Sequence, residues 1–218
     1  LDEGRLTLLT DGKSRNAFGA WSRDGRWVGY SSTRRNGTDA DLYVIDPRDP
    51  STDHRVATVT GGGWNISDFS ADGRNALAIN RLSINQAVIA EIDLRSGRMT
   101  SLTEPAQAAS YADARYAADG NIWTLSNRDA DVVRLGKLDR RSGAFAALSP
   151  ETPWDVTDYA VADDERFVVY AINDAGVSRL RVLDPASGQV RNVDGLPDGV
   201  LHWSFGHLLQ IAPWGETG

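Results

Sequence analysis

The sequence contains no cysteine, which excludes disulfides, thiolate metal sites and a cysteine nucleophile. Histidine is scarce as well, since only His54, His202 and His207 occur. The pentapeptide Gly-x-Ser-x-Gly, the nucleophile elbow of α/β-hydrolases, is also missing. His54 lies in a polar segment and is expected to be a solvated surface residue. We therefore predict that this chain is not itself an enzyme.

Excess positive charge and long apolar runs are lacking too. The 23 Lys and Arg residues are outnumbered by 30 Asp and Glu residues, for a net charge of -7. Phosphate binding needs clustered cations, so we predict no nucleic-acid partner. No stretch approaches the roughly 18–20 apolar residues that span a bilayer, and no membrane partner is expected. The compartment stays open between bacterial periplasm and cytoplasm, because both accept a chain without thiols.

Metal and phosphate motifs are incomplete. Asp39 and Asp41, like Asp129 and Asp131, place two carboxylates two residues apart, but the rest of an EF-hand loop is absent. The glycines at 61–63 lack the Lys and Ser/Thr of a phosphate-binding loop. We interpret these segments as polar loops and as a connection between structural units. No metal or cofactor is expected.

Two markers repeat along the chain at a regular period. The first marker is an aromatic or apolar residue, then a turn that contains aspartate, then an apolar run, and it occurs four times. The turn aspartates are separated by 48, 47 and 45 residues: Asp24, Asp72, Asp119 and Asp164. Further aspartates, each closing an apolar run, follow at intervals of 47, 46 and 45 residues: Asp46, Asp93, Asp139 and Asp184. Internal repeats of about 40–50 residues are typical of β-propellers.

Each repeat predicts four antiparallel strands. Short β-branched and aromatic runs bounded by Asp-Gly or Asp-x-x-x-Gly turns form hairpins, and no helical periodicity interrupts them. A lone four-stranded sheet cannot cover both of its faces, whereas radial stacking of such sheets in a propeller does. The predicted fold is therefore an all-β propeller of four complete four-stranded blades with partial blades at both ends.

The predicted boundaries describe a single propeller domain over residues 1–218. They are a partial blade at 1–12, blades at about 16–60, 64–103, 110–149 and 155–193, a partial blade at 199–212, and a divergent tail at 213–218. The N-terminal strand could close a ring with the last partial blade, but that blade would lack a strand. A fragment of a larger propeller is the favoured interpretation, and its exposed edges would promote homodimers.

Aromatic residues divide into two groups. Trp21, Phe69 and Tyr116 recur at the blade period, so they are predicted to be core residues between neighbouring sheets. Trp64 and Trp154 instead lie in connections between blades. Those connections share a propeller face with the loops between second and third strands, which carry Asn80, Asn127 and several arginines. The candidate residues for contact with a partner domain or peptide carboxylates are Arg34, Arg35, Trp64, Arg81, Arg128 and Trp154. Ordinary loop packing is the alternative.

The repeat resembles the blades of two related groups of propellers. An aromatic-Ser-x-Asp-Gly-Arg turn at 21–26 and the run Asp-Leu-Tyr-Val-Ile-Asp at 41–46 are similar to TolB-type propellers and to the N-terminal propeller of bacterial prolyl oligopeptidase-family serine peptidases. The latter include acylaminoacyl-peptidase-like and dipeptidyl-peptidase-like members. Passages closer to the peptidases are 8–16, 30–37, 61–64, 153–156 and 174–180. The resemblance covers about 5–201, and the sequence departs from it beyond Leu201, as a frame change, an appended tail or a truncation would produce.

The resemblance to the peptidases implies a gating role. In such enzymes the propeller caps an α/β-hydrolase domain that follows it, and it restricts access so that peptides rather than folded proteins reach the serine. The expected partners are then that domain, in the same polypeptide, and its peptide substrates. Dipeptidyl-peptidase relatives hold the substrate amine with a glutamate pair, and no Glu-Glu occurs here. The alternatives are a stand-alone TolB-like interaction propeller and a sugar- or ligand-binding propeller, for which no motif was found.

Overall fold

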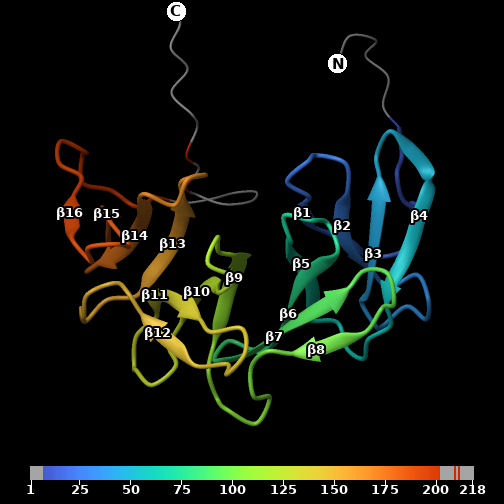
Figure 1. Cartoon of the computed structure of the whole chain (residues 1–218), viewed down its shortest axis with the longest axis horizontal. Coiled ribbons are helices and arrows are strands. Elements are labelled where there is room, and N and C mark those ends of the chain that lie inside the picture. Colours follow the sequence, from blue (N-terminus) through green and yellow to red (C-terminus); the bar gives the residue numbers. More distant parts are fainter. Residues whose placement is uncertain (1–6, 202–208, 210, 212–218) are drawn as a thin grey trace, which may run out of the picture. The chain divides into compact units, whose positions relative to one another are not determined.

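The structure, a computed structural model, describes residues 7–201, 209 and 211. All regular secondary structure in these residues is β-strand, arranged in four antiparallel four-stranded sheets (Figure 1). Nowhere in this part of the chain is there a helix of the length and apolarity that a membrane span requires. The prediction of an all-β fold with four four-stranded blades is confirmed.

Each sheet is one blade, and its four strands are neighbours in chain order. Blade 1 contains β1 (Asn16–Trp21), β2 (Val28–Ser32), β3 (Asp41–Asp46) and β4 (Asp49–Ala57). Blade 2 contains β5 (Trp64–Phe69), β6 (Asn75–Ser83), β7 (Gln86–Asp93) and β8 (Met99–Ser101). Blade 3 contains β9 (Tyr111–Tyr116), β10 (Ile122–Ser126), β11 (Arg134–Leu138) and β12 (Phe145–Ala147). Blade 4 contains β13 (Val156–Val161), β14 (Val168–Asp174), β15 (Val177–Leu183) and β16 (Val190–Asn192).

The chain divides into two compact units. Unit 1 comprises the described residues up to 116 together with 141–143, and unit 2 comprises 117–140 and the described residues from 144 onward. Strand β9 contacts β5, β6 and β7, which places it in unit 1. Strands β10–β16 belong to unit 2.

The repeated turn between the first two strands of a blade is held by side-chain hydrogen bonds. In blade 1, the Ser22 hydroxyl donates to Asp24 at 2.6 Å, and the same Asp24 oxygen accepts the Arg26 N–H at 3.0 Å. The Trp27 N–H donates to the Ser22 hydroxyl at 2.8 Å, which closes the hairpin. Ser70 and its aspartate repeat this arrangement in blade 2, at 2.7 and 3.1 Å. The Ser-x-Asp-Gly-Arg sequence therefore specifies a self-contained turn.

In unit 2 the corresponding turn of blade 4 departs from the pattern. Alanine replaces the serine at Ala162, and Glu165 occupies the glycine position with a φ of 53°. Such a left-handed conformation disfavours a residue with a side chain. The Glu165 carboxylate, however, accepts the Ala118 N–H at 2.7 Å and lies 3.8 Å from Lys137 Nζ. These contacts offset the strain that glycine would avoid.

The core of unit 1 joins blades 1 and 2. Its fully or nearly buried members are Leu42, Val44, Val56, Ala57, Ile66, Phe69, Ala76, Ala78 and Ile92. The predicted burial of Phe69 and Tyr116 is confirmed, at 0% and 8% exposure. The prediction for Trp21 is wrong, because it is 50% exposed and the nearby Phe18 is 60% exposed. Phe69 packs into a cluster with blade 1, whereas within the described part of unit 1 no sheet covers the corresponding face of blade 1.

The core of unit 2 is built around large aromatic side chains. Trp123, Tyr159 and Tyr170 are all at most 1% exposed. The Tyr159 hydroxyl donates to the Trp123 carbonyl at 3.1 Å, which ties β13 of blade 4 to β10 of blade 3. Lys137 places its ammonium 4.4 Å from the centroid of the Trp123 ring. Burial of these three large rings contributes apolar stabilisation to this unit.

Some strand positions differ from the sequence prediction. The fourth strand of blade 1 was expected near residues 56–60, but β4 begins at Asp49 and contains His54. This polar segment can form a strand because its backbone pairs with β3 while its polar side chains face the solvent. The expected strand at the N-terminus is not formed in its described part, residues 7–10. Most of the predicted partial blade at 199–212 and the tail at 213–218 lie outside the described residues.

The hairpin between β14 and β15 yields a stability prediction. Ala175 and Gly176 form a two-residue loop in which both φ angles are positive, at 50° and 88°. Alanine is strained there, so Ala175→Gly should raise the free energy of unfolding by about 0.5–1 kcal/mol. The matched control is Ala186→Gly, at a turn position without positive φ, which should lower it. Thermal unfolding of both variants is the measurement, and a loss of stability in Ala175→Gly would contradict the prediction.

Candidate functional site

Arg34 lies in the loop between β2 and β3, as predicted, and is packed against blade 1. Its guanidinium pairs with Asp53 and lies 3.7 Å from the centroid of the Tyr43 ring. The Tyr30 hydroxyl donates to the same Asp53 at 2.6 Å, and the rings of Tyr30 and Tyr43 stack 5.4 Å apart. Burial and the hydrogen bond to Asp53 raise the pKa of Tyr30. Arg34 is thus part of a polar network that joins β2, β3 and β4.

Arg35 holds the most deeply buried carboxylate in the candidate region. Its Nε donates to Asp41 Oδ2 at 2.6 Å and its Nη2 to Asp41 Oδ1 at 3.1 Å. Nη2 also donates to Asp39 at 2.9 Å and to the Val59 carbonyl at 3.0 Å. The Asp41 side chain is 0% exposed and accepts the Val59 N–H at 3.0 Å. Although burial opposes ionisation, the Arg35 hydrogen bonds lower the pKa of Asp41.

The aspartate pair of the Asp-x-Asp sequence at 39–41 shares one guanidinium. Asp39 and Asp41 both serve as acceptors for Arg35. Asp39 also accepts the Gly61 N–H at 2.8 Å, so the pair fastens the connection that leads into blade 2. Nowhere in the described residues do three or more His, Asp or Glu side chains gather as metal ligands. The sequence signal for this arrangement was the arginine pair that precedes the two aspartates.

Trp64 is the first residue of β5 and lines an apolar cavity of about 450 Å³. We call this cavity the Trp64 pocket, and its lining is Thr58, Val59, Thr60, Trp64, Asn80, Leu82, Val88, Ala90, Met99, Ser101 and Pro105. Val59 forms part of the wall, and its backbone is hydrogen-bonded to the side chains of Arg35 and Asp41. Leu82 and Ile84, at the tip of the β6–β7 hairpin, are 51% and 93% exposed. Their apolar character at a hairpin tip was a signal that the sequence reading missed.

Arg81 lies beside Trp64 because a backbone hydrogen bond connects their two segments. It was expected in a loop, but it belongs to β6, whose hairpin extends further than predicted. Its N–H donates to the Gly63 carbonyl at 3.0 Å, and its side chain is exposed. A β-carbon on Gly63 would lie 2.3 Å from the Arg81 carbonyl oxygen, so only glycine permits this approach. Unit 1 therefore brings Arg35, Trp64 and Arg81 to one end of blades 1 and 2.

Arg128 and Trp154 belong to unit 2. Arg128 lies in the loop between β10 and β11, its N–H donates to Ser126 at 3.0 Å, and its side chain is 21% exposed. Trp154 lies before β13 and is 38% exposed. The next residue, Asp155, accepts the Val133 N–H at 2.7 Å, which fixes the connection that carries the indole. Both residues occupy the predicted kinds of segment, and their role in contact with a partner stays a prediction.

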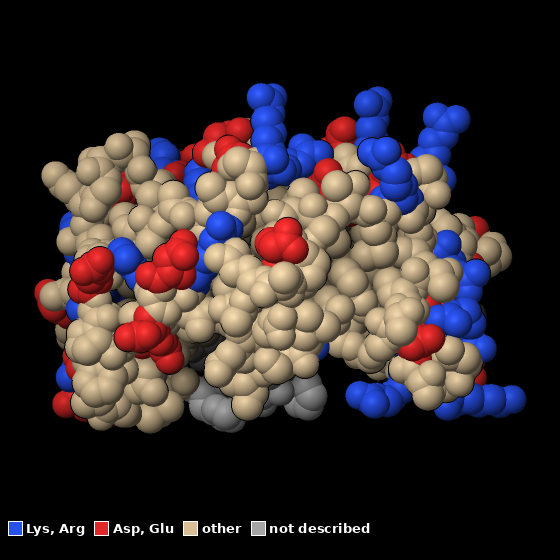
Figure 2. Space-filling model, turned by 90° about the horizontal axis from the view of Figure 1, so that it is seen from below, with Lys and Arg blue, Asp and Glu red and all other residues tan. Residues whose placement is uncertain are grey.

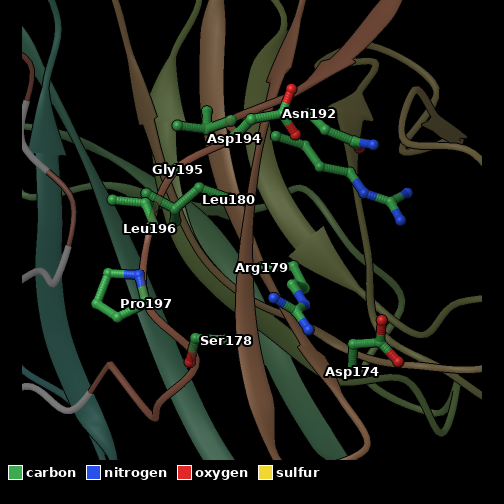
Figure 3. Close-up of a pocket in the computed structure, with 11 residues that line it drawn as sticks. Asp174, Ser178, Arg179, Leu180, Asn192, Asp194, Gly195, Leu196 and Pro197 are labelled. Carbon is green, nitrogen blue, oxygen red and sulfur yellow. The ribbon is translucent and has the colours of Figure 1, made fainter.

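A second cavity lies in unit 2, and its lining contains no set of catalytic residues. It measures about 320 Å³ and is formed by β14, β15, β16 and the segment that follows. Pro197, Leu196 and Leu180 lie along one side, while Arg179 and Asp174 lie toward the other (Figure 3). Ser178 lines it, but the Ser178 hydroxyl accepts the Leu201 N–H at 2.9 Å. The one histidine among the described residues, His54, belongs to unit 1 and does not line this cavity.

Charges of both signs are interspersed on the surface. On the face in Figure 2, Lys and Arg side chains lie among Asp and Glu and do not merge into one continuous positive area. Many of the aspartates are turn residues, such as Asp72 and Asp184, whose pKa values are lowered chiefly by hydrogen bonds from serines. The local turn geometry therefore stabilises the ionised form of these carboxylates.

The structure is similar to propellers of known proteins. Against TolB from Acinetobacter baumannii the TM-score is 0.67 at 18% identity, covering 88% of this chain and 46% of that one. Against a prolyl endopeptidase it is 0.69 at 16% identity, covering 91% and 31%. Against a puromycin hydrolase S511A mutant complexed with PGG it is 0.66 at 18% identity, covering 87% and 32%. The chain thus spans less than half the length of each of these three proteins.

No protein-family model matches the sequence, and no curated protein sequence matches it significantly. The structural comparisons therefore carry the assignment, and at these identities they establish the fold. The resemblance inferred from the repeats is confirmed at this level. The chain has the β-propeller fold of TolB and of the prolyl oligopeptidase-type enzymes.

Proposed function

We propose that this chain is the non-catalytic propeller domain of a prolyl oligopeptidase-like serine peptidase and restricts access to a separate α/β-hydrolase domain. The supporting observation is that 91% of the chain aligns with only 31% of a prolyl endopeptidase, so that the aligned part of that enzyme is a minor portion of its length. The printed sequence contains no nucleophile elbow, which is consistent with a separate catalytic domain.

The contact with such a domain would use exposed side chains of each unit, one beside the Trp64 pocket in unit 1 and one in the connection before β13 in unit 2. Arg34 and Arg35 are committed to ion pairs within blade 1. Arg81 and Trp154 instead expose their side chains, and Arg and Trp are enriched in the central contacts of interfaces. Their proposed role is to bind the hydrolase domain or the carboxylates of its peptide substrates.

The first test is to read the coding sequence that follows codon 218 and to label the full gene product with a fluorophosphonate. A Gly-x-Ser-x-Gly followed by Asp and His, together with labelling of that serine, would support the peptidase. A stop codon with no hydrolase domain in any frame would refute it. In that case the TolB-like interaction propeller, supported by the match to 88% of this chain, becomes the better assignment.

If the hydrolase domain exists, its docking can be measured with the two domains supplied separately. Arg81→Ala with Trp154→Ala should weaken docking about tenfold or more, because exposed anchors dominate such contacts. The matched control is Arg166→Ala, whose side chain is 82% exposed in the turn at the other end of β13 and β14. Equal effects of the double variant and the control would contradict the assigned contact face.

A further inference from the structure

A cavity of about 590 Å³ lies between blades 1 and 2 within unit 1. We call it the Trp27 pocket, and its lining is Trp27, Val44, His54, Phe69, Gly73, Arg74, Asp93, Leu94 and Arg95. It is placed beside the Asp-Gly turn of blade 2, whereas the Trp64 pocket lies at the other end of the same strands. The volume falls within the roughly 300–1,000 Å³ range of small-ligand sites. Its apolar floor and polar rim have the character of such sites.

The floor of the Trp27 pocket is a fixed aromatic surface. Trp27 is half-buried and packs against the core that contains Phe69. The Arg26 guanidinium lies 5.0 Å from the centroid of the Trp27 ring, and the His54 ring meets it nearly edge-on at 6.1 Å and 87°. His54 Nδ1 lies 2.7 Å from the Thr52 carbonyl, which favours the protonated Nδ1 and orients the ring. The apolar wall is therefore held in place before any ligand binds.

The rim carries two arginines with little internal compensation. The Arg74 side chain is 81% exposed, and its Nε lies 3.7 Å from Asp72. Such an exposed ion pair contributes little to stability. The Arg95 guanidinium makes no ion pair or hydrogen bond with the residues that the structure describes. Both arginines are on short turns that blade 2 presents to the cavity.

The acidic residue of the rim is directed toward its own turn. Asp93 Oδ1 accepts the Arg95 N–H at 3.1 Å, the Ser96 N–H at 2.7 Å and the Ser96 hydroxyl at 2.8 Å. These hydrogen bonds, led by those from Ser96, lower the pKa of Asp93. Among the residues that line the pocket, two are arginines and one is a carboxylate, so the lining itself has an excess of positive charge. An anionic group at the rim would be stabilised by both arginines.

We propose that the Trp27 pocket binds a ligand that joins a carboxylate to an aromatic or branched aliphatic group. The apolar group lies on Trp27 and Leu94, and the carboxylate lies between Arg74 and Arg95. A free acid and the C-terminal residue of a peptide share this chemistry. The inference does not rest on the peptidase assignment, because the pocket is at the other end of the blades from the proposed docking face.

The test is a pair of probes that differ only in charge. The full chain is labelled with ¹⁵N and titrated with N-acetyl-phenylalanine and with N-acetyl-phenylalaninamide, while the indole N–H signals of the seven tryptophans are followed. The acid should shift the Trp27 signal and bind about fivefold to tenfold more tightly than the amide, because two charge-assisted contacts are lost in the amide. Equal affinities, or shifts confined to other tryptophans, would overturn the proposal.

Substitutions locate the carboxylate. Arg74→Gln with Arg95→Gln should reduce the affinity for the acid about tenfold and leave that for the amide unchanged. Arg98→Gln is the matched control, since Arg98 follows the same turn, is exposed and does not line the pocket. A control that weakens the acid as much as the double variant would refute the assigned positions. The peptide Ala-Gly-Phe separates the sources: tighter binding than N-acetyl-phenylalanine identifies a peptide C-terminus, and equal binding a single-residue acid.

Discussion

Asp41→Ala should lower the free energy of unfolding by about 3 kcal/mol, because it removes a buried carboxylate from its hydrogen-bonded ion pair. The Asp41 side chain is 0% exposed and accepts bonds from Arg35 and from the Val59 N–H. In the variant that N–H has no partner, and the guanidinium loses its two-point contact. For a domain of this size the midpoint of thermal unfolding should fall by about 6–12 °C.

The matched control for this variant is Asp39→Ala. Asp39 binds the same guanidinium at 2.9 Å, but its side chain is 20% exposed, so water can replace part of what is lost. A smaller loss of stability is therefore expected than for Asp41→Ala. Thermal unfolding followed by circular dichroism measures both. If the two variants lost equal stability, burial of Asp41 would not be the determining factor.

The same pair predicts a dependence on pH. The pKa of Asp41 is lowered in the folded state, chiefly by Arg35 once the opposing cost of burial is overcome. The contribution of Asp41 to the free energy of unfolding is therefore complete above its unfolded-state pKa of about 3.9. It is lost as the pH falls through the pKa of the folded state. The stability difference between the parent and Asp41→Ala should be constant from pH 7 to about 5 and should shrink below pH 4. A difference that grew under acid would show that the carboxylate is destabilising when ionised.

The repeat was sufficient to predict the four blades, because each turn carries its own side-chain hydrogen bonds. Ser22 with Asp24 and Ser70 with its aspartate close their hairpins locally, so the pattern of residues and the geometry coincide. Exposure of Trp21 did not follow from the repeat, since the burial of an equivalent residue depends on which sheet lies over that face.

The candidate residues were identified by type and segment, but their partners depend on contacts between distant parts of the chain. Arg35 was chosen for its charge, whereas its structural role comes from Asp41 and from Val59, 24 residues away. The partly buried Asp68 likewise receives the Tyr116 N–H from another blade at 2.8 Å, and desolvation raises its pKa. The contact of Arg35 with Val59 is set by how the strands of blade 1 fold back on one another, and that of Asp68 with Tyr116 by how one blade packs on the next.

Gly63→Ala is expected to have the other large effect. The residue precedes Trp64, and a β-carbon there would meet the Arg81 carbonyl oxygen at 2.3 Å and the Asn80 Oδ1 at 2.8 Å. The first of these is a backbone atom that also belongs to the β6 strand, so the strain cannot be relieved by a side-chain rotation. Such overpacking typically costs about 1–3 kcal/mol, and the close backbone contact places this site at the upper end.

The neighbouring glycine provides a control that separates space from composition. A β-carbon on Gly62 would lie 3.7 Å from the Thr38 carbonyl, an ordinary contact, and Gly62 has no positive φ. Gly62→Ala should therefore be neutral or raise the free energy of unfolding by about 0.5 kcal/mol, because alanine restricts the unfolded chain. Two identical substitutions at adjacent positions should thus change stability in opposite directions. Gly63 precedes Trp64 in the chain and its carbonyl accepts the Arg81 N–H. Gly63→Ala should therefore also alter the Trp64 indole N–H signal, whereas Gly62→Ala should leave that signal unchanged. Equal unfolding midpoints for the two variants would show that the close approach of these two strands is not what requires glycine.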